Sequence, residues 1–221
     1  GEWTLLDGLS LNGNLTLSAG TLLVTSNDIS LPGNWTSSGG VFTPGTGTVT
    51  FTGNSTTIAG TDASENFYNL TLNKTAGQSL SCGGSIATLA IGNNYTQTSG
   101  NFSAPATFTV GTDFTMTSGT YTANSALTVG GDMLLTSGTY TAAANPATVS
   151  GDFTNNGATF NAGTSTFTFN GSDFNVSTIR VPSNHLFVLI NDAIAFLVIG
   201  NVRLLPSVIA QKLSIFSIVL I

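Results

Sequence analysis

The sequence is short of charge. Only 6% of its 221 residues are charged, and 4 Lys and Arg against 10 Asp and Glu give a net charge of −6. Globular proteins usually carry about 25% charged residues. Nucleic-acid binding requires many Lys and Arg side chains to replace phosphate counterions, so we expect no nucleic-acid partner. The four cations are Lys74, Arg180, Arg203 and Lys212.

Cysteine and histidine are almost absent. Cys82 stands alone, which excludes an intrachain disulfide and a Cys/His zinc cluster, and we expect it to be a small buried side chain. The one histidine, His185, has no Gly-x-Ser-x-Gly nucleophile motif to work with, and no Gly-x-x-x-x-Gly-Lys phosphate loop exists. We therefore predict that the protein is not an enzyme, that it needs no cofactor and that His185 is structural or exposed.

Long apolar runs are missing before residue 185. A membrane-spanning helix needs about 20 consecutive apolar residues, and nothing earlier in the chain approaches that length. We expect no membrane contact for this part. A chain with so little charge and no spanning segment is typical of repetitive extracellular proteins, whose polar surface comes from Thr, Ser, Asn and Gly.

The sequence contains an internal repeat of about 20 residues. A fixed period of this length is typical of repeat architectures. An Asn or Asp stands before a large apolar residue at 94, 113, 132 and 152, and Asp173 follows. Ser-Gly corners before Phe102, Tyr121 and Tyr140 keep the same period, as do alternating runs such as 107–110 and 126–129. We interpret the motifs Gly13-Asn14-Leu15 and Gly33-Asn34-Trp35, 20 residues apart, as the same pattern toward the N-terminus.

Each unit holds three short alternating runs separated by Gly, Asn, Ser or Pro, which indicates strands. A unit this short cannot bury its apolar face alone, whereas stacked units can. We predict an all-β fold, a single parallel β-solenoid of roughly nine to eleven coils with three short strands per coil. A sandwich of hairpins is the alternative, but its turns would be irregularly spaced. Two columns should form the core stack: Tyr95, Phe114, Met133 and Phe153; and Phe102, Tyr121, Tyr140 and Phe160.

The run Phe67-Tyr-Asn-Leu-Thr-Leu-Asn73, followed by Gly-Asn-aromatic repeats, resembles the repetitive β-solenoid regions of large secreted bacterial and archaeal surface proteins of the adhesin or fibre type. The resemblance covers roughly residues 9–191. It implies an extracellular or cell-surface location and assigns no catalytic residue.

The acidic positions of the repeat are Asp113, Asp132, Asp152 and Asp173, with Asn14, Asn34 and Asn94 interpreted as their equivalents in other coils. Stacked coils would bring these carboxylates about one strand spacing apart, which disfavours joint ionisation. Either the carboxylates are well solvated, or they accept hydrogen bonds from corner amides as a ladder, or a cation such as calcium bridges them. The amide equivalents favour the ladder.

Hydroxyl and amide residues suggest two further features. Thr-x-Thr pairs, for example Thr120/Thr122 and Thr139/Thr141, would face outward, and we interpret them as spread over several faces.

Asn-x-Ser/Thr sequons offer glycosylation candidates in a host that modifies asparagine. The nine sequon asparagines are Asn14, Asn34, Asn54, Asn69, Asn73, Asn94, Asn101, Asn170 and Asn175.

The composition changes near the end of the chain. We divide the chain into solenoid repeats at 1–184 and an apolar C-terminal segment at 185–221, in which Ile, Leu and Val replace Gly and Thr. The segment either adds further coils, caps the solenoid or joins subunits by donating a strand. A spanning helix is a poorer reading because Gln211 and Lys212 interrupt it.

From these patterns we expect an extracellular structural protein, a subunit of a surface filament or stalk that assembles end to end with copies of itself. The alternative is an adhesin or binding module that recognises glycan, calcium or ice through one face of the solenoid.

Overall fold

The computed structural model describes residues 1–171, 174–176, 186–191, 194–199 and 217–220, with side chains described for residues 1–171. All regular structure in these ranges is β-strand. No helix long and apolar enough to span a membrane occurs in the described part of the chain.

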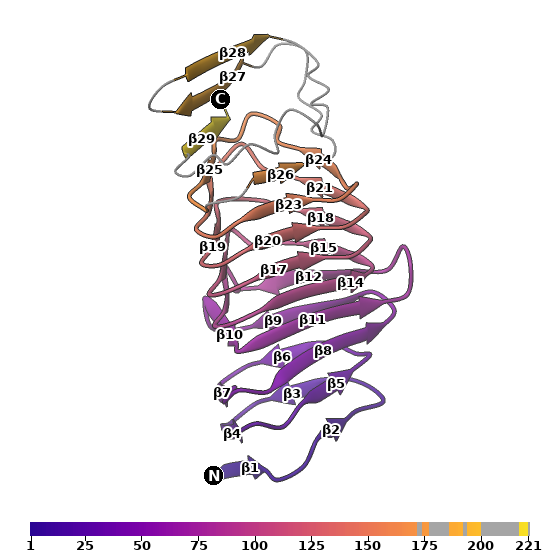
Figure 1. Ribbon diagram of the computed structural model, residues 1–221. Coiled ribbons are helices and arrows are strands. Elements are labelled where there is room, and N and C mark those ends of the chain that lie inside the picture. Colours follow the sequence, from indigo (N-terminus) through magenta and orange to yellow (C-terminus); the bar gives the residue numbers. More distant parts are fainter. Residues whose placement is uncertain (172–173, 177–185, 192–193, 200–216, 221) are drawn as a thin grey trace.

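The chain winds as a parallel β-solenoid of about 8 coils of roughly 20 residues (Figure 1). Each coil contributes one strand to each of three sides, and within each sheet the strands of the coils pair in parallel with their equivalents one coil away. The predicted fold class is confirmed. The expected count of nine to eleven coils was too high, because the step from Asn69 to Asn94 takes 25 residues and the described C-terminal strands do not pair in parallel.

The first sheet runs the length of the stack. Its strands are β2 (Leu9–Ser10), β5 (Ile29–Leu31), β8 (Thr48–Gly53), β11 (Asn69–Lys74), β14 (Tyr95–Ser99), β17 (Phe114–Met116), β20 (Met133–Leu135), β23 (Phe153–Asn155) and β26 (Phe174–Val176). The second sheet lies across the core from it. Its strands are β3 (Leu15–Leu17), β6 (Trp35–Ser37), β9 (Thr56–Gly60), β12 (Ser79–Gly84), β15 (Asn101–Ser103), β18 (Thr120–Thr122), β21 (Thr139–Thr141) and β24 (Thr159–Asn161).

The third side of the solenoid is divided between two sheets. The N-terminal sheet contains β1 (Glu2–Leu5), β4 (Gly20–Val24) and β7 (Gly40–Thr43). The later sheet contains β10 (Ser64–Phe67), β13 (Thr88–Ile91), β16 (Thr107–Val110), β19 (Leu127–Val129), β22 (Ala147–Val149) and β25 (Phe167–Phe169), followed by β29 (Ser217–Leu220), β27 (Leu186–Asn191) and β28 (Ile194–Ile199).

The last three strands of that sheet differ from the coils. β29 pairs antiparallel with β25, and β27 pairs antiparallel with both β29 and β28. The described parts of the predicted 185–221 segment therefore extend one side of the solenoid with antiparallel strands. The other residues of the segment, including His185, lie outside the described ranges.

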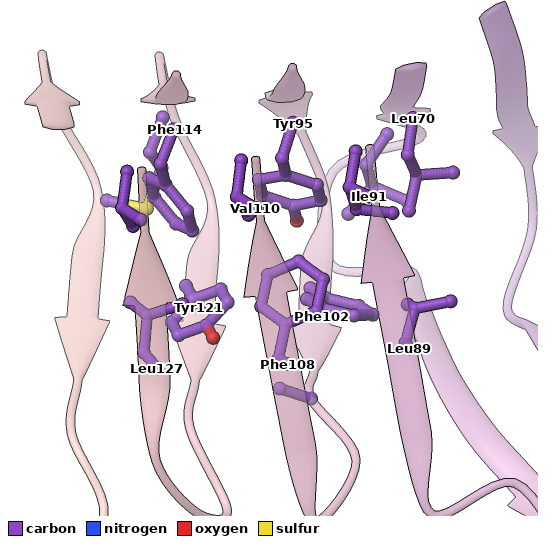
Figure 2. Close-up of a cluster of buried hydrophobic side chains, with 14 of the residues drawn as sticks. Leu70, Leu89, Ile91, Tyr95, Phe102, Phe108, Val110, Phe114, Tyr121 and Leu127 are labelled. Atoms are coloured by element: carbon purple, nitrogen blue, oxygen red, sulfur yellow. The ribbon is translucent and has the colours of Figure 1, made fainter. Parts of the chain in front are cut away.

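Strand alternation fills the core. In most first-sheet and later third-side strands two side chains point inward around one outward residue, whereas β15, β18, β21 and β24 point a single side chain inward. Figure 2 shows these inward side chains, among them Tyr95, Phe108 and Tyr121, meeting between the three sheets. The first column expected from sequence pairs Tyr95 with Phe114, Phe114 with Met133 and Met133 with Phe153. The second pairs Phe102, Tyr121, Tyr140 and Phe160 in turn.

Candidate functional surfaces

The corner that leads into the first sheet carries a continuous ladder of side-chain hydrogen bonds, which we call the corner ladder. The N–H of Asp113 donates to Asn94 Oδ1 (3.1 Å), the N–H of Asp132 to Asp113 Oδ1 (2.9 Å), and the N–H of Asp152 to Asp132 Oδ1 (2.8 Å). Each side chain thus ties its own coil to the next. Asp173 lies outside the described residues.

The same corner in earlier coils is held by residues other than those proposed from sequence. Asp28 Oδ1 accepts the N–H of Thr48 (2.8 Å), and Asn69 Oδ1 accepts the N–H of Asn94 (3.2 Å). Asn14 and Asn34 instead precede second-sheet strands, where Asn14 Oδ1 accepts the N–H of Asn34 (2.8 Å). Their assignment as equivalents of Asp113 was wrong, because Gly-Asn-apolar motifs occur at more than one corner and their period alone does not fix the phase.

The carboxylates of the corner ladder bear on the calcium hypothesis. In the part of the chain that the structure describes, no three His, Cys, Asp or Glu residues come together in a group that could hold a metal ion. Asp113, Asp132 and Asp152 each use Oδ1 or their backbone N–H within the ladder. A calcium ladder stays a prediction, which a rise of the melting temperature in millimolar calcium would support.

A polar cluster interrupts the apolar core where the N-terminal third-side sheet gives way to the later one. Glu65, in β10, points inward at the position that Leu89 holds in the next coil. Trp35 Nε1 donates to Glu65 Oε2 (2.9 Å), and burial raises the pKa of this carboxyl. Burial, together with the charge of Glu65, raises the pKa of the Cys82 thiol to about 12. A thiol with that pKa is protonated and unreactive.

Lys74, at the end of β11, is buried, and it has no carboxylate partner in the part of the chain that the structure describes. Its Nζ donates to the carbonyl oxygens of Thr52 (2.9 Å) and Asn54 (2.7 Å), and it lies 6.0 Å from the centroid of the Phe51 ring. Burial lowers the pKa of the ammonium group to about 8. The charge is stabilised by carbonyl dipoles and an aromatic face, and the two carbonyl groups belong to the end of β8 and the residue that follows it.

Inward polar side chains also satisfy backbone groups at the corners. Gln97 Nε2 donates to Gly100 O (2.8 Å), Asn155 Nδ2 to Ala158 O (3.0 Å) and Ser37 Oγ to Gly40 O (3.0 Å), each three residues ahead. These residues, Glu65 and Lys74 were missed from sequence. The sequence does carry a signal for Gln97, because this polar residue stands at the repeat position that the apolar Met116 occupies in the next coil.

The outward face of the second sheet carries two ranks of hydroxyl and amide residues. Strand pairing places Thr120 opposite Thr139 and Thr122 opposite Thr141. The same registers continue into neighbouring coils through β12, β15 and β24. The Thr pairs of the chain lie on several sides, as expected, because Thr48/Thr50 is in β8 and Thr107/Thr109 is in β16, whereas the pairs of β18 and β21 share the same two ranks. The two ranks are Ser79, Asn101, Thr120, Thr139 and Thr159; and Ser81, Ser103, Thr122, Thr141 and Asn161.

The glycosylation candidates differ in how much their side chains are engaged. Asn34, Asn69, Asn94 and Asn101 are half-buried and accept hydrogen bonds from the neighbouring coil. The exposed asparagines are Asn14, Asn54, Asn73 and Asn170. Asn14 Oδ1 accepts the N–H of Asn34, and Asn73 Oδ1 accepts the hydroxyl of Ser99. The side chain of Asn175 is not among those described.

No protein-family model, curated protein or solved structure matches this chain.

Proposed function

We propose that this protein is an extracellular structural protein, a subunit of a cell-surface filament or stalk that assembles end to end with copies of itself. The observation that carries the proposal is the parallel stack of coils, in which each coil offers strand edges on three sides to the next coil. An unpaired strand edge is a template for a further strand. Contacts that join different ends of identical subunits produce open filaments.

The character of the exterior supports a structural role outside the cell. Outward positions of the second sheet are Thr, Ser and Asn, and only 6% of the residues in the whole chain are charged. A rod stabilised by strand pairing and stacked aromatic rings, such as Tyr121 on Tyr140 at 4.9 Å between ring centroids, transmits load along its axis through every coil. We expect such a rod to act by its length and stiffness rather than by catalysis.

Light scattering of the purified chain over a range of concentrations tests this function. Assembly should begin above a critical concentration, and sonicated fragments of the product should remove the lag phase, because elongation adds subunits to existing ends. A chain that stays monomeric at every concentration, with or without fragments, would contradict the proposal.

A binding role is the second candidate, and the two outward ranks of the second sheet favour it. Hydroxyls in these ranks repeat at one strand spacing, about 4.8 Å, along the solenoid, and at two residues, roughly 6.6 Å, across it. A rigid, uncharged, doubly periodic surface is suited to a periodic ligand such as ice, whose lattice oxygens both donate and accept hydrogen bonds.

Thermal hysteresis of the wild type and of a Thr122→Lys/Thr141→Lys variant tests this candidate. Ice binding predicts hysteresis in the wild type and its loss in the variant, because two lysines break one rank. A Thr109→Lys/Thr128→Lys variant on the third side is the matched control and should keep the hysteresis. The candidate fails if the wild type shows none.

A further inference from the structure

The third side of the solenoid is interrupted between β7 and β10, in the middle of the stack. β7 pairs with β4 and ends the N-terminal sheet, whereas β10 pairs with β13 and begins the later sheet (Figure 1). In the same two coils the other two sides are continuous, because β5 pairs with β8 and β6 pairs with β9. β10 is therefore an internal sheet edge, held by a single strand neighbour among the described residues.

Glu65 lies in this edge strand and points into the core. Its side chain is 6% exposed, and it takes the inward position that Leu89 holds in the next coil. Its two oxygens accept hydrogen bonds from Trp35 Nε1 (2.9 Å) and from the N–H of Asn66 (3.3 Å). Both donors are neutral, and no Lys or Arg of the described residues pairs with this carboxyl.

The groups around the carboxyl make its ionisation costly in the closed fold. Burial is the largest cause of its raised pKa, and the charge of Asp62, in the loop before β10, raises the pKa further, whereas the two hydrogen bonds lower it. The Cys82 thiol of β12 has a pKa of about 12 and stays neutral. An ionised Glu65 would therefore lie among apolar side chains and near a second acid, without a compensating charge.

Opening of β10 relieves this cost without unwinding the stack. Residues 61–64 and Asn66 are exposed, and Glu65 and Phe67 are the buried residues of the strand. Moving β10 outward breaks its pairing with β13, whereas a strand such as β16 would have to leave two neighbours. Strands with few buried contacts and one paired edge open at the lowest free energy.

We propose that β10 is a pH-dependent latch on the third side of the solenoid, closed while Glu65 is protonated and loosened when Glu65 is ionised. A protonated carboxyl fits the core and keeps its hydrogen bond from Trp35. An ionised carboxylate is more stable in water, so it favours the open strand. This inference goes beyond the proposed function and does not depend on filament assembly.

Hydrogen exchange of the full chain from pH 4 to 8, corrected for the intrinsic rate at each pH, tests the latch. The folded pKa of Glu65 lies above 4.5, so the closed strand is most stable below about pH 4.5 and loses that stability as pH rises through the folded pKa. Amides of β10 should lose protection in this window by up to about tenfold per pH unit. Glu65→Gln should remove the dependence, because its amide gains no charge. The amides of β16 are the internal control and should keep their protection.

Asp62→Asn supplies an independent variant. Asp62 is exposed in a loop, so the fold should be kept, and removing its charge lowers the folded pKa of Glu65. The loss of protection in β10 should therefore be smaller than in the wild type. Protection of β10 that does not change with pH, or that changes equally in Glu65→Gln, would overturn the latch. An equal loss in β16 would mean that the whole stack opens and would refute a local latch.

Discussion

Asp132 ties two coils together through a single side chain. It lies at the corner before β20, where its N–H donates to Asp113 Oδ1 and its own Oδ1 accepts the N–H of Asp152. An aspartate and an asparagine offer the same oxygen in this position, and Asn94 fills the same role one coil before Asp113. What the corner requires is therefore an acceptor on a short side chain rather than a negative charge.

The first prediction compares two substitutions at Asp132. Asp132→Ala should lower the free energy of unfolding by about 1 kcal/mol, because the N–H of Asp152 loses its acceptor. Asp132→Asn should leave it unchanged or raise it, because the oxygen stays and repulsion between stacked carboxylates falls. Urea denaturation measures both. An equal loss in both variants would show that the charge itself is needed, as a bridging cation would require.

The second prediction concerns buried tyrosine hydroxyls. Tyr121 OH is buried with no hydrogen-bond partner among the described residues, whereas Tyr95 OH donates to Gln97 Oε1 (3.0 Å). Tyr121→Phe should be neutral or stabilising by up to about 1 kcal/mol, and Tyr95→Phe should destabilise by about 1 kcal/mol. Thermal unfolding of the two variants provides the comparison. A matching loss in Tyr121→Phe would reveal a partner for that hydroxyl.

The third prediction is a pH dependence centred on Glu65. Its folded pKa lies above the unfolded value of 4.5, so its contribution to stability is fully present below about pH 4.5 and is lost as pH rises through the folded pKa. Glu65→Gln should therefore gain stability relative to the wild type as pH increases from 4 to 7. Denaturation of the wild type and of Glu65→Gln at several pH values measures the difference, and a difference that does not change with pH would contradict it.

At the scale of the element, the corners decide which residues the repeat must keep. The Ser-Gly corners before β15, β18 and β21 stack Gly100, Gly119 and Gly138, each with a positive φ of 87 to 89°. A Cβ on Gly119 would overlap the carbonyl oxygen of Gly100 one coil away. Glycine is therefore needed twice over, for its φ and for the close approach of two backbones.

The fourth prediction separates these two requirements. Gly119→Ala and Gly77→Ala both place alanine at a positive φ, but a Cβ on Gly77 has no neighbour within 4 Å. Gly77→Ala should cost about 1–2 kcal/mol of backbone strain. Gly119→Ala should cost roughly 1–3 kcal/mol more, because the coils must shift apart. Equal losses of stability in chemical denaturation would contradict the close stacking at this corner.

The strands of the coils could be predicted from the sequence, but the sheet to which each Gly-Asn corner belongs could not. The period and the alternation of residues such as Phe114 and Tyr121 predicted three strands per coil, because stacking forces equivalent residues into the same place. It could not tell that Asn14 belongs to a second-sheet corner and Asn94 to a first-sheet corner, since both follow a Gly-Asn pattern. It also missed Glu65 and Lys74, because a charge inside a core depends on partners that only the folded coils bring near.

At the scale of the whole molecule, the coils form one continuous stack and its ends carry the proposed activity. The core columns, the corner ladder and the outward Thr ranks each continue from coil to coil, so each layer resembles the surface on which the next one rests. Trp3 and Leu6, in the first coil, are exposed. The described C-terminal strands instead extend one side with antiparallel pairing.

Negative-stain electron microscopy of the purified full chain shows whether copies of the solenoid join end to end. We expect unbranched filaments of constant width that lengthen with protein concentration, because each added copy would continue the same stack of coils. Monodisperse short rods at all concentrations, in a chain whose circular dichroism shows folded β-structure, would contradict it and turn attention to the outward Thr ranks as the working surface.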